Sequence, residues 1–197
     1  MKTLLQISRV IIVAIALMIA WNFPLVESLV TPVFARQAAP ASAASQADST
    51  FVYSKLGIEA PITIAPNSSP MNSQNWGAIR DALKHGVSVA YAGSDFATAP
   101  LVYVSGHSSD TYPHPFSSVF AGLGQAKVGD TFSLKVNNIL YTYKVVGQEQ
   151  VSPTNVTEFP HLAETMRQES PQVVELVTCW PVLTTARRLV TVGVLIK

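Results

Sequence analysis

The feature that most limits the fold is the alternation of short apolar segments with turn residues from Phe51 to the C-terminus. Segments of this length, rich in β-branched and aromatic residues and bounded by Gly, Pro and Asn, are typical of strands. They comprise residues 51–58, 60–65, 86–91, 100–105, 131–136, 140–149, 173–179 and 189–196. Asn137 and Asn138 predict a hairpin turn. Residues 76–84 and 117–123 have helical character, and 157–169 is expected to mix loop and helix. About eight short strands with few helices favour a mainly β fold, a closed eight-stranded β-barrel with short helices, over a βαβ sheet.

The N-terminal region contains a long apolar run with a basic start. Every residue from 10 to 20 is apolar, and no charge lies between Arg9 and Glu27. The run is either a secretory signal cleaved after Ala35 or an uncleaved signal-anchor whose basic end stays inside. Since a membrane span needs ~20 apolar residues, we favour the anchor. Both interpretations export the rest of the chain, and the anchor makes it a single-pass protein of the cell membrane with an extracellular domain.

Composition divides the chain into three parts. Residues 1–35 form the signal-anchor or signal peptide, 36–50 an Ala/Ser-rich flexible linker, and 51–197 a domain long enough to bury its own core. The 13 basic and 12 acidic residues nearly balance, so the sequence predicts no nucleic-acid partner. Without a glycine-rich phosphate loop or zinc-ligand spacing, it also predicts no cofactor and no metal.

The chain has a single cysteine, Cys179, which ends an apolar segment of strand character. Arg187 and Arg188 open the next strand after a short loop. An exported lone cysteine cannot form an internal disulfide. The thiol is therefore either a small buried hydrophobe or a nucleophile beside an arginine that holds a carbonyl or oxyanion.

A nucleophilic thiol needs a histidine partner, and the chain has four histidines. We interpret His85, His114 and His161 as solvated loop residues. His107 differs because it follows an apolar strand and a glycine, in the sequence VYVSGH. Catalytic side chains are often presented at such strand ends, so His107 is the candidate partner.

Two long segments resemble the sortases, the cysteine transpeptidases of bacterial cell surfaces. They are VYVSGHSSDTYPHPFSSVFAGLGQAKVGDTFSL and VVELVTCWPVLTTARRLVTVGVL, and the resemblance covers nearly all of residues 51–197. It implies a sortase catalytic domain whose catalytic residues are His107, Cys179 and Arg188, which follow one another along the chain as in the family. The short loop between Cys179 and Arg188 resembles the class D and E type. One departure is Glu175, which stands where the family's T-L-x-T-C pattern has its first threonine.

The resemblance also implies an activity. The thiol would cleave an LPXTG-like sorting signal between Thr and Gly, form a thioester, and pass the acyl group to an amine. The partners would be proteins carrying sorting signals, an acceptor amine from a cell-wall precursor or a pilin lysine, and the membrane. The role would be surface anchoring or pilus assembly.

The choice between the two arginines depends on which face each presents. Arg188 shares its parity with the apolar row Val190, Val192 and Val194, which a simple interpretation would place in the core. The resemblance nevertheless implies Arg188. The apolar character of the row and the choice of Arg188 are compatible if this row lines an apolar substrate groove on the outside of the barrel. The predicted substrate-binding residues are Val177, Thr178, Val190 and Val192.

Two other classes of function remain as alternatives. A cysteine hydrolase of the papain type would have its cysteine at a helix N-terminus and before the histidine, whereas here His107 precedes Cys179 and the cysteine ends a strand. An exported β-barrel binding module would carry an inert buried thiol, which a thiol reagent would distinguish from both enzymes.

Overall fold

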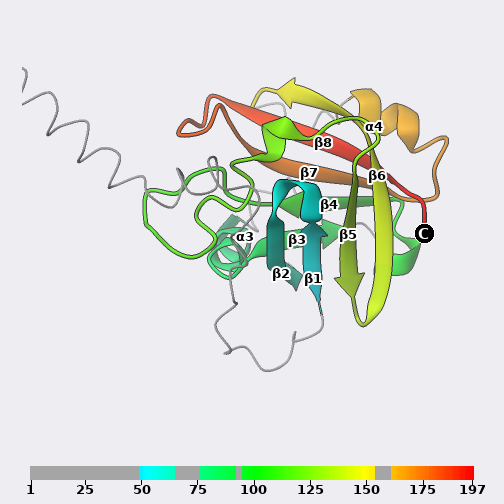
Figure 1. Ribbon diagram of the computed structural model, residues 1–197, viewed down its shortest axis with the longest axis horizontal. Helices are drawn as coiled ribbons and strands as arrows, with labels where there is room; N and C mark the ends of the chain where they lie inside the picture. The colour runs from blue at the N-terminus through cyan, green and yellow to red at the C-terminus, as the bar shows by residue number, and fades with distance from the viewer. Residues whose placement is uncertain (1–48, 65–75, 92–94, 154–160) are drawn as a thin grey trace, which may run out of the picture.

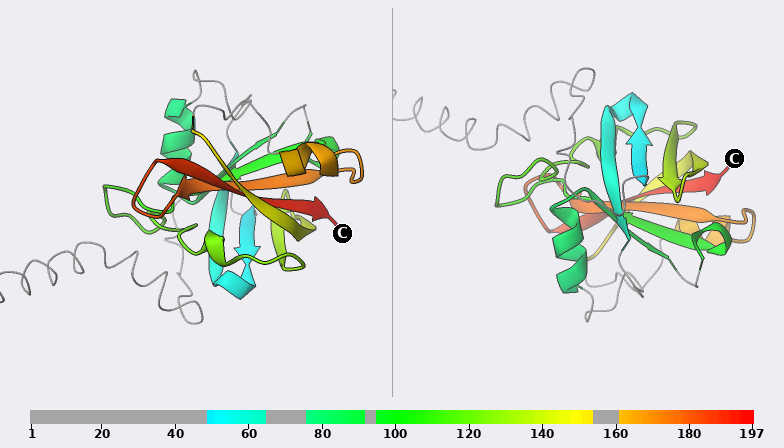
Figure 2. Two further views of the ribbon diagram at one scale, coloured as in Figure 1. Left: turned by 90° about the horizontal axis from the view of Figure 1, so that it is seen from above. Right: turned by 90° about the horizontal axis from the view of Figure 1, so that it is seen from below.

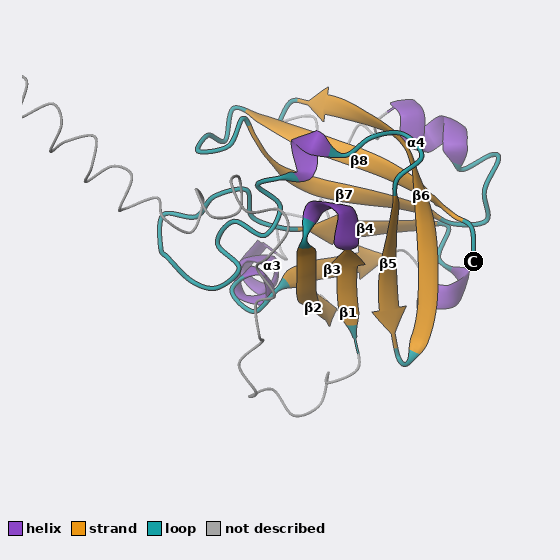
Figure 3. Cartoon of the chain, in the orientation of Figure 1, coloured by secondary structure: helices purple, strands orange, loops and turns teal. Residues whose placement is uncertain are grey.

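The computed structural model describes residues 49–64, 76–91, 95–153 and 161–197. The predicted anchor and nearly all of the predicted linker lie outside these residues, and no helix within them is long and apolar enough to cross a membrane. Strands dominate, as Figure 3 shows. They are β1 (Thr50–Tyr53), β2 (Ile58–Ile64), β3 (Val87–Tyr91), β4 (Leu101–Ser105), β5 (Thr131–Val136), β6 (Ile139–Val151), β7 (Val173–Trp180) and β8 (Arg187–Leu195). The helices are α3 (Trp76–Leu83) and α4 (His161–Met166), with 3₁₀ turns η1 (Ser54–Leu56), η3 (Phe96–Thr98) and η4 (Leu123–Gln125).

The strands close into one barrel in the order β1-β2-β3-β4-β7-β8-β6-β5. Closure comes from the pairing of β1 with β5, and it removes the unpaired edges that an open sheet would expose. The β2–β3 and β4–β7 pairs are parallel and the others antiparallel. Figures 1 and 2 show α3 and α4 outside the ring of strands. The predicted eight-stranded barrel is confirmed.

Local turn chemistry explains where the chain reverses. The β5–β6 hairpin turns at Asn137 and Asn138, which have φ of 50° and 69°, as the sequence predicts. The expected strand over 51–58 is instead two strands, because β1 and β2 pair antiparallel and the chain must reverse between them. It does so through η1 and Gly57, whose φ of 66° costs glycine little.

The predicted helix over 117–123 is wrong. This segment forms successive turns, in which the Ser117 N–H donates to the His114 carbonyl and the Ala121 N–H to the Ser118 carbonyl. The turns direct Phe116 and Phe120 into the barrel's core cluster, where Phe120 is fully buried. Burial of these two rings therefore outweighs a weak helical tendency.

The two larger of three buried apolar clusters hold the barrel together, and the third joins only Ile79 and Leu83 of α3. The first fills the barrel and includes Phe51, Phe120 and Phe132, with the Phe51 and Phe120 ring centroids 5.3 Å apart. The second lies between the outer face of the sheet and α4. Its buried members are Ala90, Leu101, Tyr103, Ala163, Val173, Val190 and Val192. The outer face of β7 and β8 is thus mainly apolar where α4 covers it, with Glu175 as a buried polar exception.

Candidate active site

The pairing of β7 with β8 places Cys179 directly opposite Arg188. In this antiparallel register Trp180 is opposite Arg187. Side chains directly opposite in such a ladder lie on one face, with Cβ atoms about 5 Å apart. Arg188, and not Arg187, therefore shares the face of the thiol.

That face is the outside of the barrel. Leu189 packs in the interior cluster, whereas Val190 and Val192 belong to the cluster beneath α4. The expected outward orientation of the Arg188 row is confirmed. However, Val190 is 2% exposed and Val192 fully buried, because α4 packs over them. In this conformation neither side chain is open to a substrate. The other predicted groove residue on this face, Val177 of β7, is half-buried and lies two residues before Cys179.

Thr178 faces the barrel interior and is buried. Its hydroxyl donates to the carbonyl of Gly106 at 2.8 Å, and the Gly106 N–H donates to the carbonyl of Val177 at 3.1 Å. Thr178 thus fixes the end of β4 against β7 and does not reach the surface where a substrate would bind. Its predicted role in substrate binding is replaced by a supporting one.

His107 follows directly from this fixed strand end. In the parallel β4–β7 register Ser105 is paired with Val177, so His107 leaves the end of β4 that lies beside the Cys179 end of β7. The His107 carbonyl accepts a hydrogen bond from the Phe120 N–H at 2.8 Å. A Cβ on Gly106 would lie 2.5 Å from the Phe120 ring, so only glycine fits before the histidine.

The two loops that carry these residues meet at one end of the barrel. Figures 1 and 2 show the loop after β4 and the loop joining β7 to β8 at the same end. The Leu183 N–H donates to Oγ of Ser109 at 3.1 Å, which ties the loops together. Arg188 is held by its own loop, since its Nη1 donates to the carbonyls of Thr185 and Arg187 at 3.3 and 3.2 Å.

A family model for the sortase domain matches residues 54–196. The chain belongs to the sortase family. Together with the barrel and the Cys179–Arg188 register, this match disfavours the papain-type and inert-module alternatives. No curated protein matches this sortase significantly.

Solved sortases share its fold at low sequence identity. The pilus-related sortase C of Group B Streptococcus has a TM-score of 0.56 at 18% identity, covering 84% of this chain and 78% of that one. Sortase C-1 from Actinomyces oris has a TM-score of 0.55 at 19% identity, with 76% and 73% covered. The sortase D5 transpeptidase of Clostridium perfringens has a TM-score of 0.53 at 16% identity, with 76% and 79% covered. These likenesses concern the fold.

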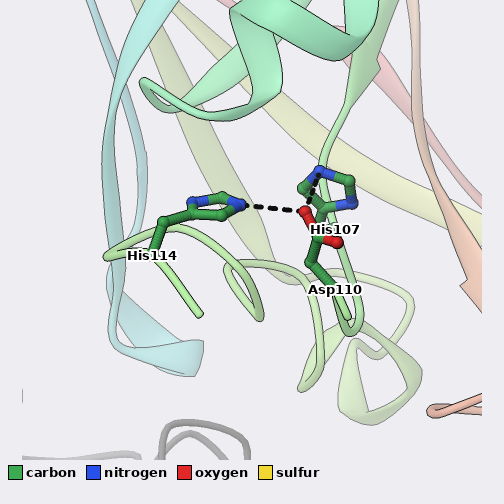
Figure 4. A group of neighbouring side chains, drawn as sticks. All are labelled: His107, Asp110 and His114. Carbon is green, nitrogen blue, oxygen red and sulfur yellow. Dashed lines mark hydrogen bonds and ion pairs between the residues drawn. The ribbon is translucent and has the colours of Figure 1, made fainter. Parts of the chain in front are cut away.

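Figure 4 shows a cluster in this sortase that the sequence analysis missed. Asp110 Oδ2 lies 3.1 Å from Nε2 of His114 and 3.4 Å from Nε2 of His107. The His114 side chain is only 16% exposed, so its interpretation as a solvated loop residue is wrong. The turns after Asp110 fold the loop back, which the spacing H-x₂-D-x₃-H could have suggested. His85 is exposed as expected, and His161 begins α4.

For His107 and for Asp110, burial and the neighbouring charges have opposing effects on the pKa. Burial lowers the pKa of His107, the charge of Asp110 raises it, and that of His114 lowers it. Partial burial raises the pKa of Asp110, but hydrogen bonds from the Tyr112 N–H and His114 and the charges of both histidines bring it below its usual value. Asp110 is therefore ionised at neutral pH. The three ligand atoms lie within 4.8 Å of one another, a separation that could also hold a metal ion.

Glu175, the departure from the family pattern, lies in the outer row two residues before Val177. It is 2% exposed, and its Oε1 has no hydrogen-bond partner among the described residues. Burial and the charge of Glu149 raise its pKa to about 8, against a lowering influence of Arg167. At neutral pH the carboxyl group is mostly protonated, so the surrounding apolar cluster does not contain a full negative charge.

Proposed function

We propose that this sortase is a cysteine transpeptidase that cleaves an LPXTG-like sorting signal between Thr and Gly. The observation that carries the proposal is the β7–β8 register, which puts Cys179 opposite Arg188 on the outer face. The β4–β7 register supports it, because the strand that leads to His107 ends beside the Cys179 end of β7. Nucleophile, acid and carbonyl donor thus come from three adjacent strands.

Each residue has a separate task in the proposed reaction. The Cys179 thiolate attacks the Thr carbonyl carbon, and the Arg188 guanidinium donates to the developing oxyanion. The C–N bond to Gly breaks as protonated His107 gives its proton to the leaving amine. An acceptor amine then attacks the thioester, an amide bond forms, a proton is lost from the amine, and the thiolate is released.

The class and the acceptor are narrower parts of the proposal. The connection between the end of β7 at Trp180 and the start of β8 at Arg187 is short, which supports a class D/E-like sortase. The acceptor amine belongs to a cell-wall precursor or a pilin lysine, and the substrates are surface proteins with sorting signals. The product is accordingly an anchored protein or a pilus.

Residues 1–35 are proposed to anchor the enzyme in the cell membrane, with residues 51–197 outside. Membrane-held substrates would then meet it at a raised effective concentration. The full chain should sediment with membranes and resist extraction by high salt, because buried apolar surface and not charge holds it. A soluble form beginning near Arg36 would show instead that the segment is a cleaved signal peptide.

The decisive test of the activity uses the full chain in detergent with a library of LPXTG-like peptides, with and without amines. We expect a covalent acyl-enzyme on Cys179 by mass spectrometry, and a transpeptidation product when an amine is added. Failure to form the adduct with any library member, in a folded protein, would contradict the proposed function.

A further inference from the structure

We propose that Asp110 is a positioning residue for the histidine of this sortase: its carboxylate holds Nε2 of His107 and favours the imidazolium, and His114 competes for the same oxygen. The inference rests on the proposed function, in which His107 acts as the acid. It adds a carboxylate and a second histidine to the Cys179, His107 and Arg188 set.

The carboxylate that carries the inference is fixed by its own loop. Asp110 Oδ1 accepts a hydrogen bond from the Tyr112 N–H at 3.3 Å, an Asx turn that sets the side chain's orientation. This leaves Oδ2 facing both rings, as Figure 4 shows. It lies 3.4 Å from Nε2 of His107 and 3.1 Å from Nε2 of His114. The ring centroids are 5.6 Å apart in an edge-to-face arrangement. One oxygen therefore serves two imidazoles.

The contacts of His114 determine which of its nitrogens carries the proton. The Phe116 N–H donates to Nδ1 of His114 at 3.3 Å, so Nδ1 must offer a lone pair. The proton of neutral His114 then lies on Nε2, where it is donated to Asp110. A metal ion on Nε2 would require a proton on Nδ1, facing another N–H group, whereas metal-bound histidines donate that proton to an acceptor. The geometry thus favours a carboxylate clamp over a metal centre.

The clamp has a consequence for His107. With Nε2 paired to Asp110, Nδ1 is the nitrogen left to deliver a proton to the leaving amine. A carboxylate at one ring nitrogen is a known way to orient an imidazole and stabilise its protonated form. Here it offsets part of the effect of burial, which keeps the pKa of His107 below its usual value.

The charged groups around His107 have opposite effects. Asp110 and His114 face it from its own loop, and Cys179 and Arg188 are on β7 and β8 at the same end of the barrel. Asp110 raises the pKa of His107 through its charge, and His114 lowers it. The Arg188 guanidinium is directed to carbonyls of its own loop. Variants of Asp110 and His114 should therefore shift His107 in opposite directions.

The experiment measures the His107 titration directly by NMR. Full-length protein in detergent micelles, labelled at histidine, gives few ring signals because the chain has four histidines. Asp110→Asn retains the Asx-turn acceptor but removes the charge and replaces the shared Oδ2 acceptor with an NH₂ donor. An opposite charge at this distance typically shifts a pKa by ~1–3 units, so we expect a fall of about one unit. His114→Ala frees the carboxylate for His107 and should raise the pKa.

The same variants are then assayed with the peptide identified by the acyl-enzyme screen. In Asp110→Asn, kcat/KM near neutral pH should fall about tenfold, because one pKa unit is a factor of ten in imidazolium above the pKa, and the break in the pH–rate profile that follows the His107 titration should move to lower pH. Asp110→Glu keeps the negative charge, so the pKa of His107 should stay closer to its wild-type value than in Asp110→Asn. Asp95→Asn is the matched control, because it makes the same charge change beyond the other end of β4 and keeps its cap on η3. It should leave both measurements unchanged.

Three results would overturn the inference. The first is an unmoved His107 titration in Asp110→Asn, and the second is a shifted titration with an unchanged pH–rate profile. The third is loss of both the His107 and His114 signals at micromolar zinc, which would make the cluster a metal site. Failure of the proposed function appears elsewhere, as the absence of an acyl-enzyme on Cys179, and the NMR titration remains interpretable in that case.

Discussion

Cys179→Ala should abolish both cleavage and transfer of the sorting-signal peptide. The change removes the only thiol in the chain, and the other residue paired with Arg188, Val151 of β6, carries no nucleophilic group. Loss of a covalent nucleophile leaves only background turnover, a fall of ~10³-fold or more. The measurement is peptide turnover by liquid chromatography, with and without an acceptor amine.

The fold should survive this change. Cys179 is only half-buried at the end of β7, so removing one sulfur atom leaves no large cavity. Thermal unfolding should therefore be close to that of the wild type. The control is Thr131→Ala, an exposed position at the start of β5 near the end of the barrel away from Arg188, which should retain activity. Turnover near the wild-type rate in Cys179→Ala would exclude the thioester mechanism.

Arg188→Lys should reduce turnover strongly although it conserves the charge. Lysine lacks the planar fork with which a guanidinium can hold a carbonyl and an oxyanion. Loss of one oxyanion donor typically costs ~10²–10³ in rate. The effect should fall mainly on kcat, because the interaction forms fully only in the transition state.

Arg187→Lys is the natural control, since it makes the same chemical change one residue away. Arg187 is exposed and opposite Trp180, on the other face of the strand from the thiol. Its substitution should change kcat/KM little. If Arg187→Lys were damaging and Arg188→Lys silent, the catalytic face would have to be reassigned to the row containing Leu189 and Thr191.

The two arginine variants also test how the loop is held. In this structure the Arg188 guanidinium donates to the carbonyls of Thr185 and Arg187. A substrate carbonyl would have to share or replace these acceptors. Arg188 therefore connects the conformation of the β7–β8 loop to occupation of the site.

Sequence patterns were sufficient for most of the barrel strands and for the three catalytic candidates. Strands follow from local alternation and turn chemistry, which is why the Asn137–Asn138 hairpin appears as predicted. Cys179 and His107 could be selected because each ends an apolar strand, where a side chain is held by a rigid element. The choice of Arg188 came from the family resemblance, and the β7–β8 register supports it independently.

What covers each face could not be derived from the sequence. Alternation assigns Val190 and Val192 to one side of β8, but only the packing of α4 shows that they are buried beneath a helix. Thr178 likewise alternates with its neighbours, and its inward bond to Gly106 depends on a strand 72 residues away. Burial is a property of contacts between distant segments. A local pattern can therefore predict which face of a strand a side chain is on, but not which element packs over that face.

The tertiary structure alone brought together His107, Asp110 and His114. Their loop reverses through turns whose hydrogen bonds depend on Phe116 and Phe120 entering the barrel. The local sequence offers only the spacing of Asp110 between His107 and His114, which does not by itself separate His114 from a solvated histidine between two prolines. The sequence determined the strands, the hairpin and the candidate nucleophile because these depend on residues close in the chain. The covered groove face and the carboxylate shared by two imidazoles depend on how a long loop and a helix pack against the closed barrel, which only the folded chain decides.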